Sequence, residues 1–226
     1  MCPIPGTRSA PPRYFSRLDL RYSGSVVSDV VRVTHSLNAA QVEAGYRKGE
    51  FPMGNPGVGL ITWHRPRRRA VLPLETFHVS RSLERVLKQR RFEVTFDTAF
   101  PRIMDACGER EGGTWITRDL KAVYCELHRA GKAHSVEVWC EGELVGGLYG
   151  VRLGGAFFAE SKFHRRTDMS KVALAELVFR LRERGFGLLE VQYVTPHLAQ
   201  FGVIEIADRV YHERLAAALG LSCAFT

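Results

Sequence analysis

The sequence has little that supports cofactor or metal chemistry. None of its five cysteines stands in a C-x-x-C pair, and its eight histidines lack the spacing of zinc ligands. No G-x-G-x-x-G segment or P-loop precedes a predicted helix, which argues against NAD or ATP. The cysteines also lack the His and Asn pattern of a thiol nucleophile. We therefore expect no cofactor and no bound metal, and we interpret the cysteines as reduced thiols of a cytosolic protein.

Long apolar runs are missing as well. No stretch approaches the 18 residues that suggest a membrane span. The first eight residues lack the continuous apolar segment of a signal peptide. Four prolines in the first twelve residues exclude regular structure there. These absences predict a cytoplasmic protein without a membrane partner and a flexible lead-in over residues 1–25.

The composition is that of an ordinary globular protein with a basic surface. Of its 226 residues, 45% are hydrophobic and 25% are charged, so one or two domains can bury a core. The net charge of +8 favours a polyanionic partner, with nucleic acid ahead of a membrane. A solvated basic surface that keeps the protein soluble explains the same charge. The charge alone leaves both interpretations open.

The hydrophobic pattern predicts an α+β fold. A change in composition around residues 75–80 suggests a small N-terminal α/β domain over residues 26–78 and a second domain over 79–226. Asn38 and Gln41 form a predicted capping box for a helix that ends before Gly49. The order that follows residue 80 is typical of acyl-CoA N-acetyltransferase-like folds with a mostly antiparallel sheet. The other predicted elements are a loop at 51–59, strands at 60–63, 70–72, 76–79 and 92–96, helices at 80–89, 100–107 and 117–131, a three-stranded meander at 135–160, a helix at 170–184, a strand at 188–193 and a helix at 208–219.

A basic face and several aromatic residues are candidates for nucleic-acid contact. Arg81, Arg85 and Lys88 share one face of a predicted helix, and Arg91 follows it. Such a face suits a phosphate backbone, although a solvated helix face has the same pattern. Three aromatic side chains could stack on a base or pack in the core: Trp63, Trp115 and Tyr149.

Three polar residues at the ends of two predicted strands are candidates for chemistry. Glu160 ends an apolar strand, which raises its pKa and makes it a general base or an anchor for a cation. A carboxylate paired with Lys162 or Arg165 is the structural alternative. Glu190 and Gln192 alternate on one face of the next strand, where a buried hydrogen-bond network is equally compatible. We expect all three to meet above the apolar face of the helix at 170–184.

Several motifs together resemble one enzyme family. The segments Gly112-Gly-Thr-Trp-Ile-Thr117 and Val145-Gly-Gly-Leu-Tyr-Gly150 are the most specific. Tyr46–Pro52, Arg69–Leu74 and Ala159–Phe163 continue the likeness, which extends over residues 40–212. The chain resembles the leucyl/phenylalanyl-tRNA–protein transferases.

This resemblance implies an activity and its partners. The family moves Leu or Phe, and Met less well, from aminoacyl-tRNA to proteins that begin with Arg or Lys, and so marks them for N-end-rule degradation. Its catalytic domain is acetyltransferase-like, and it uses no metal or nucleotide cofactor. Two runners-up are a tRNA-dependent transferase for acidic N-termini and a catalytically silent aminoacyl-tRNA-binding module. A small-molecule N-acetyltransferase ranks third, because the coenzyme A pyrophosphate loop is missing. We expect a monomer.

The resemblance also implies roles for individual residues. Glu160 and Gln192 match the acid and the amide of the reaction centre, and we expect Glu190 to orient Gln192. Glu190 stands where the family usually has Asp, and His64 stands where a second aromatic residue is common. The apolar amino-acid pocket corresponds to Leu148, Phe157, Leu174, Leu177 and Leu189. The tRNA-binding set corresponds to Trp63, His64, Trp115, Arg81, Arg85, Lys88 and Arg91.

Overall fold

A sheet of seven strands organises the fold. The computed structural model describes residues 29–226. The predicted lead-in at 1–25 lies outside the described residues. Across the sheet the strands are β10 (Ile204–Ala207), β4 (Arg68–Val71), β9 (Leu188–Gln192), β8 (Ala156–His164), β7 (Glu143–Leu153), β6 (Ala133–Cys140) and β5 (Glu93–Phe96). In this sheet β8 and β9 run parallel to each other, and every other pair of neighbouring strands is antiparallel. The predicted meander and the predicted α+β class with a mostly antiparallel sheet are confirmed.

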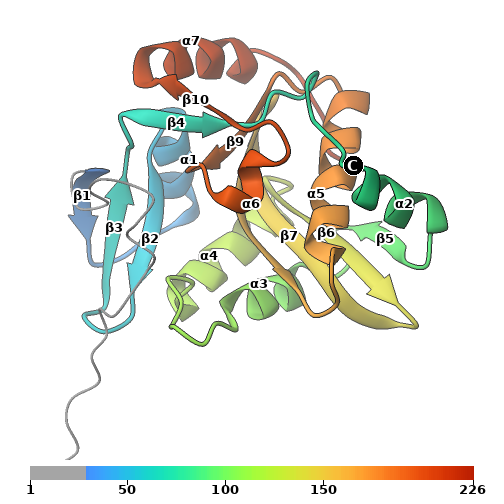
Figure 1. Cartoon of the computed structure of the whole chain (residues 1–226). Coiled ribbons are helices and arrows are strands. Elements are labelled where there is room, and N and C mark those ends of the chain that lie inside the picture. Colours follow the sequence, from blue (N-terminus) through green and yellow to red (C-terminus); the bar gives the residue numbers. More distant parts are fainter. Residues whose placement is uncertain (1–28) are drawn as a thin grey trace, which may run out of the picture.

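Helices cover both faces of this sheet (Figure 1). On one face lie α1 (Ala39–Arg47), α3 (Phe100–Gly108), α4 (Arg118–Arg129) and α7 (Asp208–Leu219). On the other face lie α2 (Arg81–Gln89), α5 (Met169–Glu183) and the short α6 (Pro196–Ala199). Successive strand residues point to opposite faces, so Phe158 belongs to the first core and Phe157 to the second. We call these the α4 face and the α5 face.

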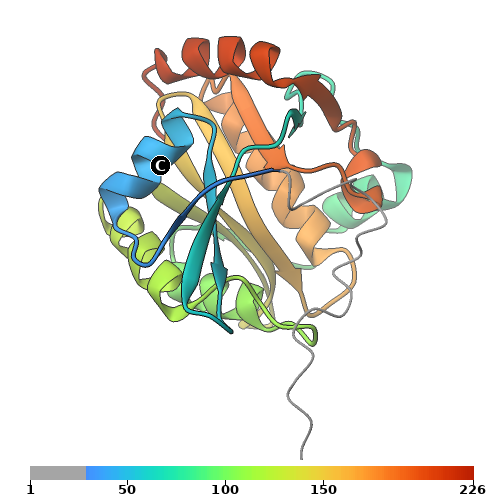
Figure 2. The same cartoon turned by 90° about the vertical axis from the view of Figure 1, so that its left-hand side faces the viewer.

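A second sheet comes from the N-terminal part of the described chain. It has the order β1 (Val30–Thr34), β3 (Leu60–His64) and β2 (Phe51–Asn55), and it lies beside α1 (Figure 2). β4 comes from the segment predicted as a separate small domain, yet it lies within the large sheet between β10 and β9. The segment at 26–78 therefore contributes a strand to the sheet that carries the candidate site.

Local signals explain most helix boundaries. The side chain of Asn38 accepts from the Gln41 backbone while that of Gln41 accepts from Asn38, so the predicted capping box is confirmed. Ser80 and Thr117 cap α2 and α4 in the same way, each accepting from the backbone three residues on. The predicted helix at 208–219 matches α7.

Two local predictions were wrong. The predicted loop at 51–59 contains β2, whose Pro52 is tolerated because β2 is an edge strand that pairs with β3 on one side. The predicted strand at 76–79 pairs with no strand in the described chain. Instead the His78 N–H donates to the Phe201 carbonyl at 3.0 Å, and the ring of Phe77 stacks on that of Phe201. Isolated backbone hydrogen bonds and ring packing, and not a ladder, hold this segment.

Strand β8 contains a β-bulge at Glu160, one of the candidate residues. Tyr149 pairs with Ser161 and Gly150 pairs with Ala159, so Glu160 is the extra residue. Gly150 permits this close packing: a Cβ there would lie 2.3 Å from the Phe158 carbonyl oxygen. β8 pairs with β9 only as far as Phe158, and beyond that residue the two parallel strands part.

We expect Gly150→Ala to destabilise the protein by about 1–3 kcal/mol, because the new methyl group overpacks the bulge. Urea denaturation measures the change. Gly112→Ala is the matched control, since a Cβ at Gly112 meets no atom within 4 Å. Its effect should stay within about 0.5 kcal/mol. Equal stability of the two variants would contradict the role given to Gly150.

Candidate active site

Glu160 and Gln192 meet where β8 and β9 part. The Gln192 amide Nε2 donates to Glu160 Oε1 at 2.9 Å. Gln192 is the last residue of β9 and has φ of 58°, a left-handed conformation that residues other than glycine seldom adopt. Such strain persists only where the surroundings hold it, and it clusters at functional sites. The structure therefore brings together two of the three residues singled out from the sequence.

Two tyrosines, missed in the sequence analysis as site residues, extend this hydrogen-bond chain. The hydroxyls of Tyr46 on α1 and Tyr124 on α4 lie 2.7 Å apart, and the Tyr124 hydroxyl donates to Glu160 Oε2 at 3.4 Å. In the sequence, Tyr46 belongs to the Tyr46–Pro52 motif and Tyr124 lies in the helix predicted at 117–131, but neither feature relates them to Glu160. The chain Tyr46–Tyr124–Glu160–Gln192 joins two helices to two strands on the α4 face.

Burial controls the ionisation of this chain. Burial, supported by the negative charge of Glu190, raises the pKa of the Glu160 carboxyl to about 8, although the hydrogen bonds from the tyrosines and Gln192 act in the opposite direction. Burial, followed by the nearby charge of Glu160, also raises the pKa of the Tyr46 and Tyr124 hydroxyls well above the usual value. The tyrosines are therefore donors, and Glu160 is the group in the chain that exchanges a proton near neutral pH.

A cavity of about 150 Å³ lies next to this pair. The walls are formed by Phe51, Met53, Trp115, Glu160, Gln192 and Tyr193. The backbone N–H of Gly54 donates to the Trp115 carbonyl at 3.1 Å and so ties β2 to the loop before α4. The cavity thus combines aromatic walls with one carboxyl–amide pair. Trp115, which the sequence offered as a residue that could stack on a base, forms one of these walls.

Glu190 makes a different contact from the predicted one. It is 1% exposed, its Oε1 accepts from the Arg69 guanidinium, and its Oε2 accepts from the Tyr211 hydroxyl at 2.6 Å. The Gln192 amide is bonded to Glu160 and not to Glu190, so the expectation that Glu190 orients Gln192 stays a prediction without a direct hydrogen bond behind it in the described chain. A buried carboxylate needs charge-assisted partners, and β4, which lies beside β9, supplies Arg69.

Two members of the expected tRNA-binding set, Trp63 and His64, are buried. Trp63 is 0% exposed, and its indole Nε1 donates to the Thr34 hydroxyl at 3.1 Å. The guanidinium of Arg32 lies 3.5 Å from the ring centroid. His64 is 4% exposed. Neither ring lines the cavity, which leaves Trp115 as the one member of the predicted aromatic set there.

The predicted amino-acid pocket lies on the other face of the sheet. All five residues are in the core between the sheet and α5, at most 2% exposed, and none lines the cavity: Leu148, Phe157, Leu174, Leu177 and Leu189. Glu160, Glu190 and Gln192 point to the α4 face, so the prediction that they meet above the helix at 170–184 was wrong. Because helices cover both faces, the alternation in β9 did not reveal which helix faces the polar side.

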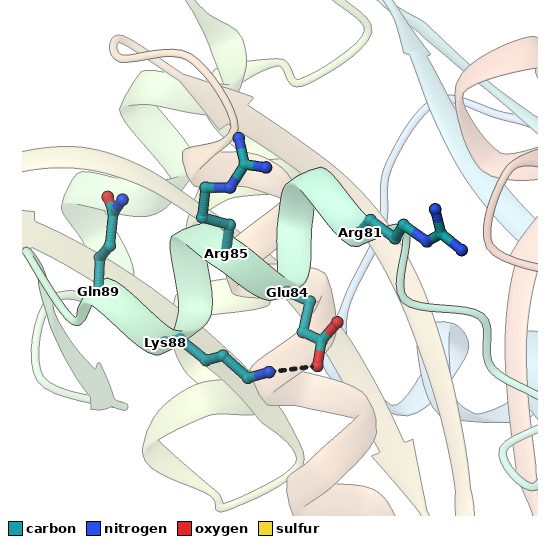
Figure 3. A pocket seen from close by; sticks show the side chains of 5 residues that line it. All are labelled: Arg81, Glu84, Arg85, Lys88 and Gln89. Atoms are coloured by element: carbon teal, nitrogen blue, oxygen red, sulfur yellow. Dashed lines mark ion pairs between the residues drawn. The ribbon is translucent and has the colours of Figure 1, made fainter.

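The predicted basic face is exposed on α2, next to α5. Arg81, Arg85 and Lys88 fan out around a surface hollow together with Glu84 and Gln89 (Figure 3). Lys88 forms an ion pair with Glu84 at 2.6 Å. Arg91 is exposed just beyond the helix. These residues remain candidates for RNA contact.

Within residues 29–226, no group of three or more His, Cys, Asp or Glu residues is arranged to hold a metal ion. No helix in that range is long and apolar enough to cross a membrane.

The raised pKa of Glu160 predicts a pH dependence of stability. An unfolded chain releases this proton near pH 4.3, by the usual value for Glu, whereas the folded protein holds it to about pH 8. The folded protein binds more protons in this window, so its free energy of unfolding falls as the pH rises through it. Glu160→Gln lacks this titration. We therefore expect its free energy of unfolding, relative to that of wild type, to rise from pH 5 to pH 8 and to stay level above pH 8.

Urea denaturation at pH 5, 7 and 9 measures this difference. Glu75→Gln removes an exposed carboxylate and is the control. If Glu160→Gln and the control show the same pH dependence, the protonated state of Glu160 is excluded.

The buried ion pair predicts strong coupling. We expect Arg69→Met to cost about 3–5 kcal/mol, because it leaves the Glu190 carboxylate buried without its cation. The double variant Arg69→Met/Glu190→Leu should cost less than the sum of the single variants, as a double-mutant cycle would show. Arg68→Met is the control: its ion pair with Glu205 lies at the surface, and its loss should cost less than about 1 kcal/mol. Additive single effects would argue against the coupling.

Comparison with known proteins agrees with the motifs. Residues 71–216 match the family leucyl/phenylalanyl-tRNA protein transferase. The chain is 51% identical over 187 residues to a leucyl/phenylalanyl-tRNA–protein transferase of Paramagnetospirillum magneticum, covering 81% of this chain and 90% of that protein. It is 51% identical over 180 residues to one of Gloeobacter violaceus, covering 80% and 93%.

A relative from Herpetosiphon aurantiacus with the same name is 48% identical over 194 residues, which cover 85% of this chain and 100% of that protein. A solved ribosomal-protein-alanine N-acetyltransferase from Brucella melitensis aligns with a TM-score of 0.36 at 15% identity, covering 58% of this chain and 94% of that one. On the strength of the sequence relatives, the chain belongs to the leucyl/phenylalanyl-tRNA–protein transferase family.

Proposed function

We propose that this transferase moves Leu or Phe, and Met less well, from aminoacyl-tRNA to the N-terminal amine of proteins that begin with Arg or Lys. The product would be marked for N-end-rule degradation in the cytoplasm. The observation that carries the proposal is the Glu160–Gln192 hydrogen bond beside the aromatic cavity. Membership of the family supports the reaction type, and the geometry supports the residues.

The cavity suits the terminal adenosine of the tRNA. Phe51, Trp115 and Tyr193 bring aromatic surfaces to its walls, and Met53 adds a polarisable apolar one. Stacking on an aromatic side chain contributes about 1–3 kcal/mol per base. An adenine held there would place its ribose, and the ester on it, at Glu160 and Gln192.

The chemistry requires positioning and one proton transfer. The ester is already activated, so the α-amine of the acceptor can attack its carbonyl carbon directly. The amide of Gln192 has no usable pKa and acts by hydrogen bonding, through its oxygen to the amine or its Nε2 to the developing oxyanion. Glu160, with its pKa near 8, accepts the proton of the amine and returns it to the departing ribose oxygen.

The carboxyl of Glu160 also favours one class of acceptor. Its ionised form attracts an N-terminus that carries an extra positive charge on Arg or Lys, and it repels an acidic N-terminal residue. This argues against the alternative transferase for acidic N-termini. A silent aminoacyl-tRNA-binding module would need the cavity but would have no use for a carboxyl that exchanges protons at the ester.

The test is transfer of labelled Leu from tRNA to a peptide that begins with Arg. We expect Gln192→Ala to slow transfer about 10²- to 10³-fold, as the loss of a group that stabilises a developing oxyanion does. Gln200→Ala is the matched control, because that amide is exposed on the surface and donates to the His197 carbonyl. Wild-type rates in Gln192→Ala would remove Gln192 from the mechanism.

The same assay, crossed with Leu-, Phe- and Met-tRNA and with peptides that begin with Arg, Lys, Asp or Glu, tests the substrates. Preferential transfer to Asp or Glu would favour the acidic-acceptor alternative. Tight binding of aminoacyl-tRNA without any peptide product would favour the silent module.

A further inference from the structure

The bulge in β8 places a second residue on the face of the sheet that carries the cavity. Ser161 stands opposite Tyr149 in the β7–β8 ladder, and Tyr149 packs in the core of the α4 face. Directly opposed residues share a face, so Ser161 points to the α4 face. Glu160 points there too, toward Tyr124. Successive strand residues normally alternate, so it is the bulge that lets these two neighbours share one face.

Arg110 connects Ser161 to the end of α3. It is the second residue after that helix. Its Nη2 donates to the Ser161 hydroxyl at 2.8 Å, and its Nε donates to the Cys107 carbonyl in the last turn of α3 at 3.1 Å. A guanidinium is planar and holds its donors in a fixed fork, so two such bonds set its orientation. The loop between α3 and α4 is therefore attached to β8 at the residue next to Glu160.

The same loop carries Trp115, which forms a wall of the cavity. The Arg110 carbonyl accepts from the Gly113 N–H at 3.1 Å, and the Trp115 carbonyl accepts from the Gly54 N–H of β2 at 3.1 Å. A Cβ at Gly54 would lie 2.7 Å from that carbonyl oxygen, so β2 and the loop are in close contact. The loop is thus held by β2 at Trp115 and by β8 at Arg110.

A further contact between the loop and the segment after β8 is weaker. Glu109 pairs with Arg165 at 2.9 Å, but the two side chains are 64% and 50% exposed. Ion pairs that are this exposed contribute little, because water solvates both charges. Arg110 instead donates to a buried hydroxyl, since Ser161 is 9% exposed. Arg110 is therefore the main anchor of the loop on β8.

We infer that Arg110 is a positioning residue, which fixes Trp115, where the terminal adenine would stack, relative to Glu160, which would accept the proton. This inference rests on the proposed function. The ester is attached to the ribose of that adenosine, so the position of the adenine sets the position of the ester. A displacement of about 1 Å from the reactive geometry can slow a reaction about 10²-fold. Arg110 thus acts on the rate more than on binding, because β2 keeps Trp115 at the cavity without it.

Steady-state transfer of labelled Phe from tRNA to a peptide that begins with Arg separates rate from binding. We expect Arg110→Met to lower kcat about tenfold and to change KM for aminoacyl-tRNA by less than about twofold. Arg110→Lys keeps a donor for the Ser161 hydroxyl and should recover part of the lost kcat. Arg166→Met is the matched control, because this exposed arginine follows β8 and pairs with Glu141 at 3.0 Å. It should keep both wild-type constants.

Ser161→Ala removes the acceptor of the same hydrogen bond and tests it from the other side. We expect this variant to lower kcat as Arg110→Met does. The double variant Arg110→Met/Ser161→Ala should be no slower than Arg110→Met, because the two groups act as a unit. Defects that multiply in the double variant would show that the two side chains act separately, which contradicts the inference.

A spectroscopic measurement follows the loop directly. The chain has three tryptophans, so 5-fluorotryptophan labelling gives three ¹⁹F signals, and Trp115→Phe assigns the one of Trp115. We expect Arg110→Met to shift or broaden the Trp115 signal and to leave those of Trp63 and Trp139 in place. The control Arg166→Met should leave all three in place. A general loss of stability would move all three signals and would contradict a specific role in positioning.

The remaining outcomes separate the inference from the proposed function. If wild type transfers the amino acid and Arg110→Met has the wild-type kcat or an unchanged Trp115 signal, the inference fails and the proposed function stands. A raised KM at the wild-type kcat would show that Arg110 contacts the RNA itself, and it would also overturn the inference. If wild type transfers nothing to any peptide, the proposed function fails together with the inference.

Discussion

The buried ion pair between Arg69 and Glu190 is the interaction on which the site depends. Arg69 comes from β4 and Glu190 from β9, and the same guanidinium donates to the Gly49 carbonyl at the turn before β2 and lies over the ring of Tyr211 on α7. Both partners are 1% exposed, so neither charge can be lost without leaving the other unsolvated. The Arg69 guanidinium thus connects the turn before β2, strand β9 and helix α7 next to the cavity.

The candidate active site lies where β8 and β9 separate. Ladder bonds join the two strands only through Phe158, and the bulge then places Glu160 on the α4 face. Gln192 closes the gap with its amide, at the cost of a left-handed backbone. The cavity beside this gap therefore combines aromatic surfaces with a carboxyl and an amide.

Local features were predictable from the sequence, and long-range partners were not. The alternation of Glu190 and Gln192 against Leu189 and Val191 followed from the period of two in a strand, and the structure has it. The caps and the meander followed from local chemistry in the same way. The partner of Glu190, however, is 121 residues distant in sequence, and Tyr124 is 36 residues from Glu160. No pattern within one element encodes such a pair.

The sequence by itself determined the family, through ordered motifs, and the elements, through periodicity and capping. It also placed Glu160 and Gln192 on neighbouring strands, but its prediction that Glu160 ends a strand was wrong, because β8 continues past the bulge to His164. Only the tertiary structure decided that these two face α4 and not α5, and that Trp63 is a core residue while Trp115 lines a cavity. The physical reason is that burial and charge compensation are properties of the packed neighbourhood, which forms from segments far apart along the chain.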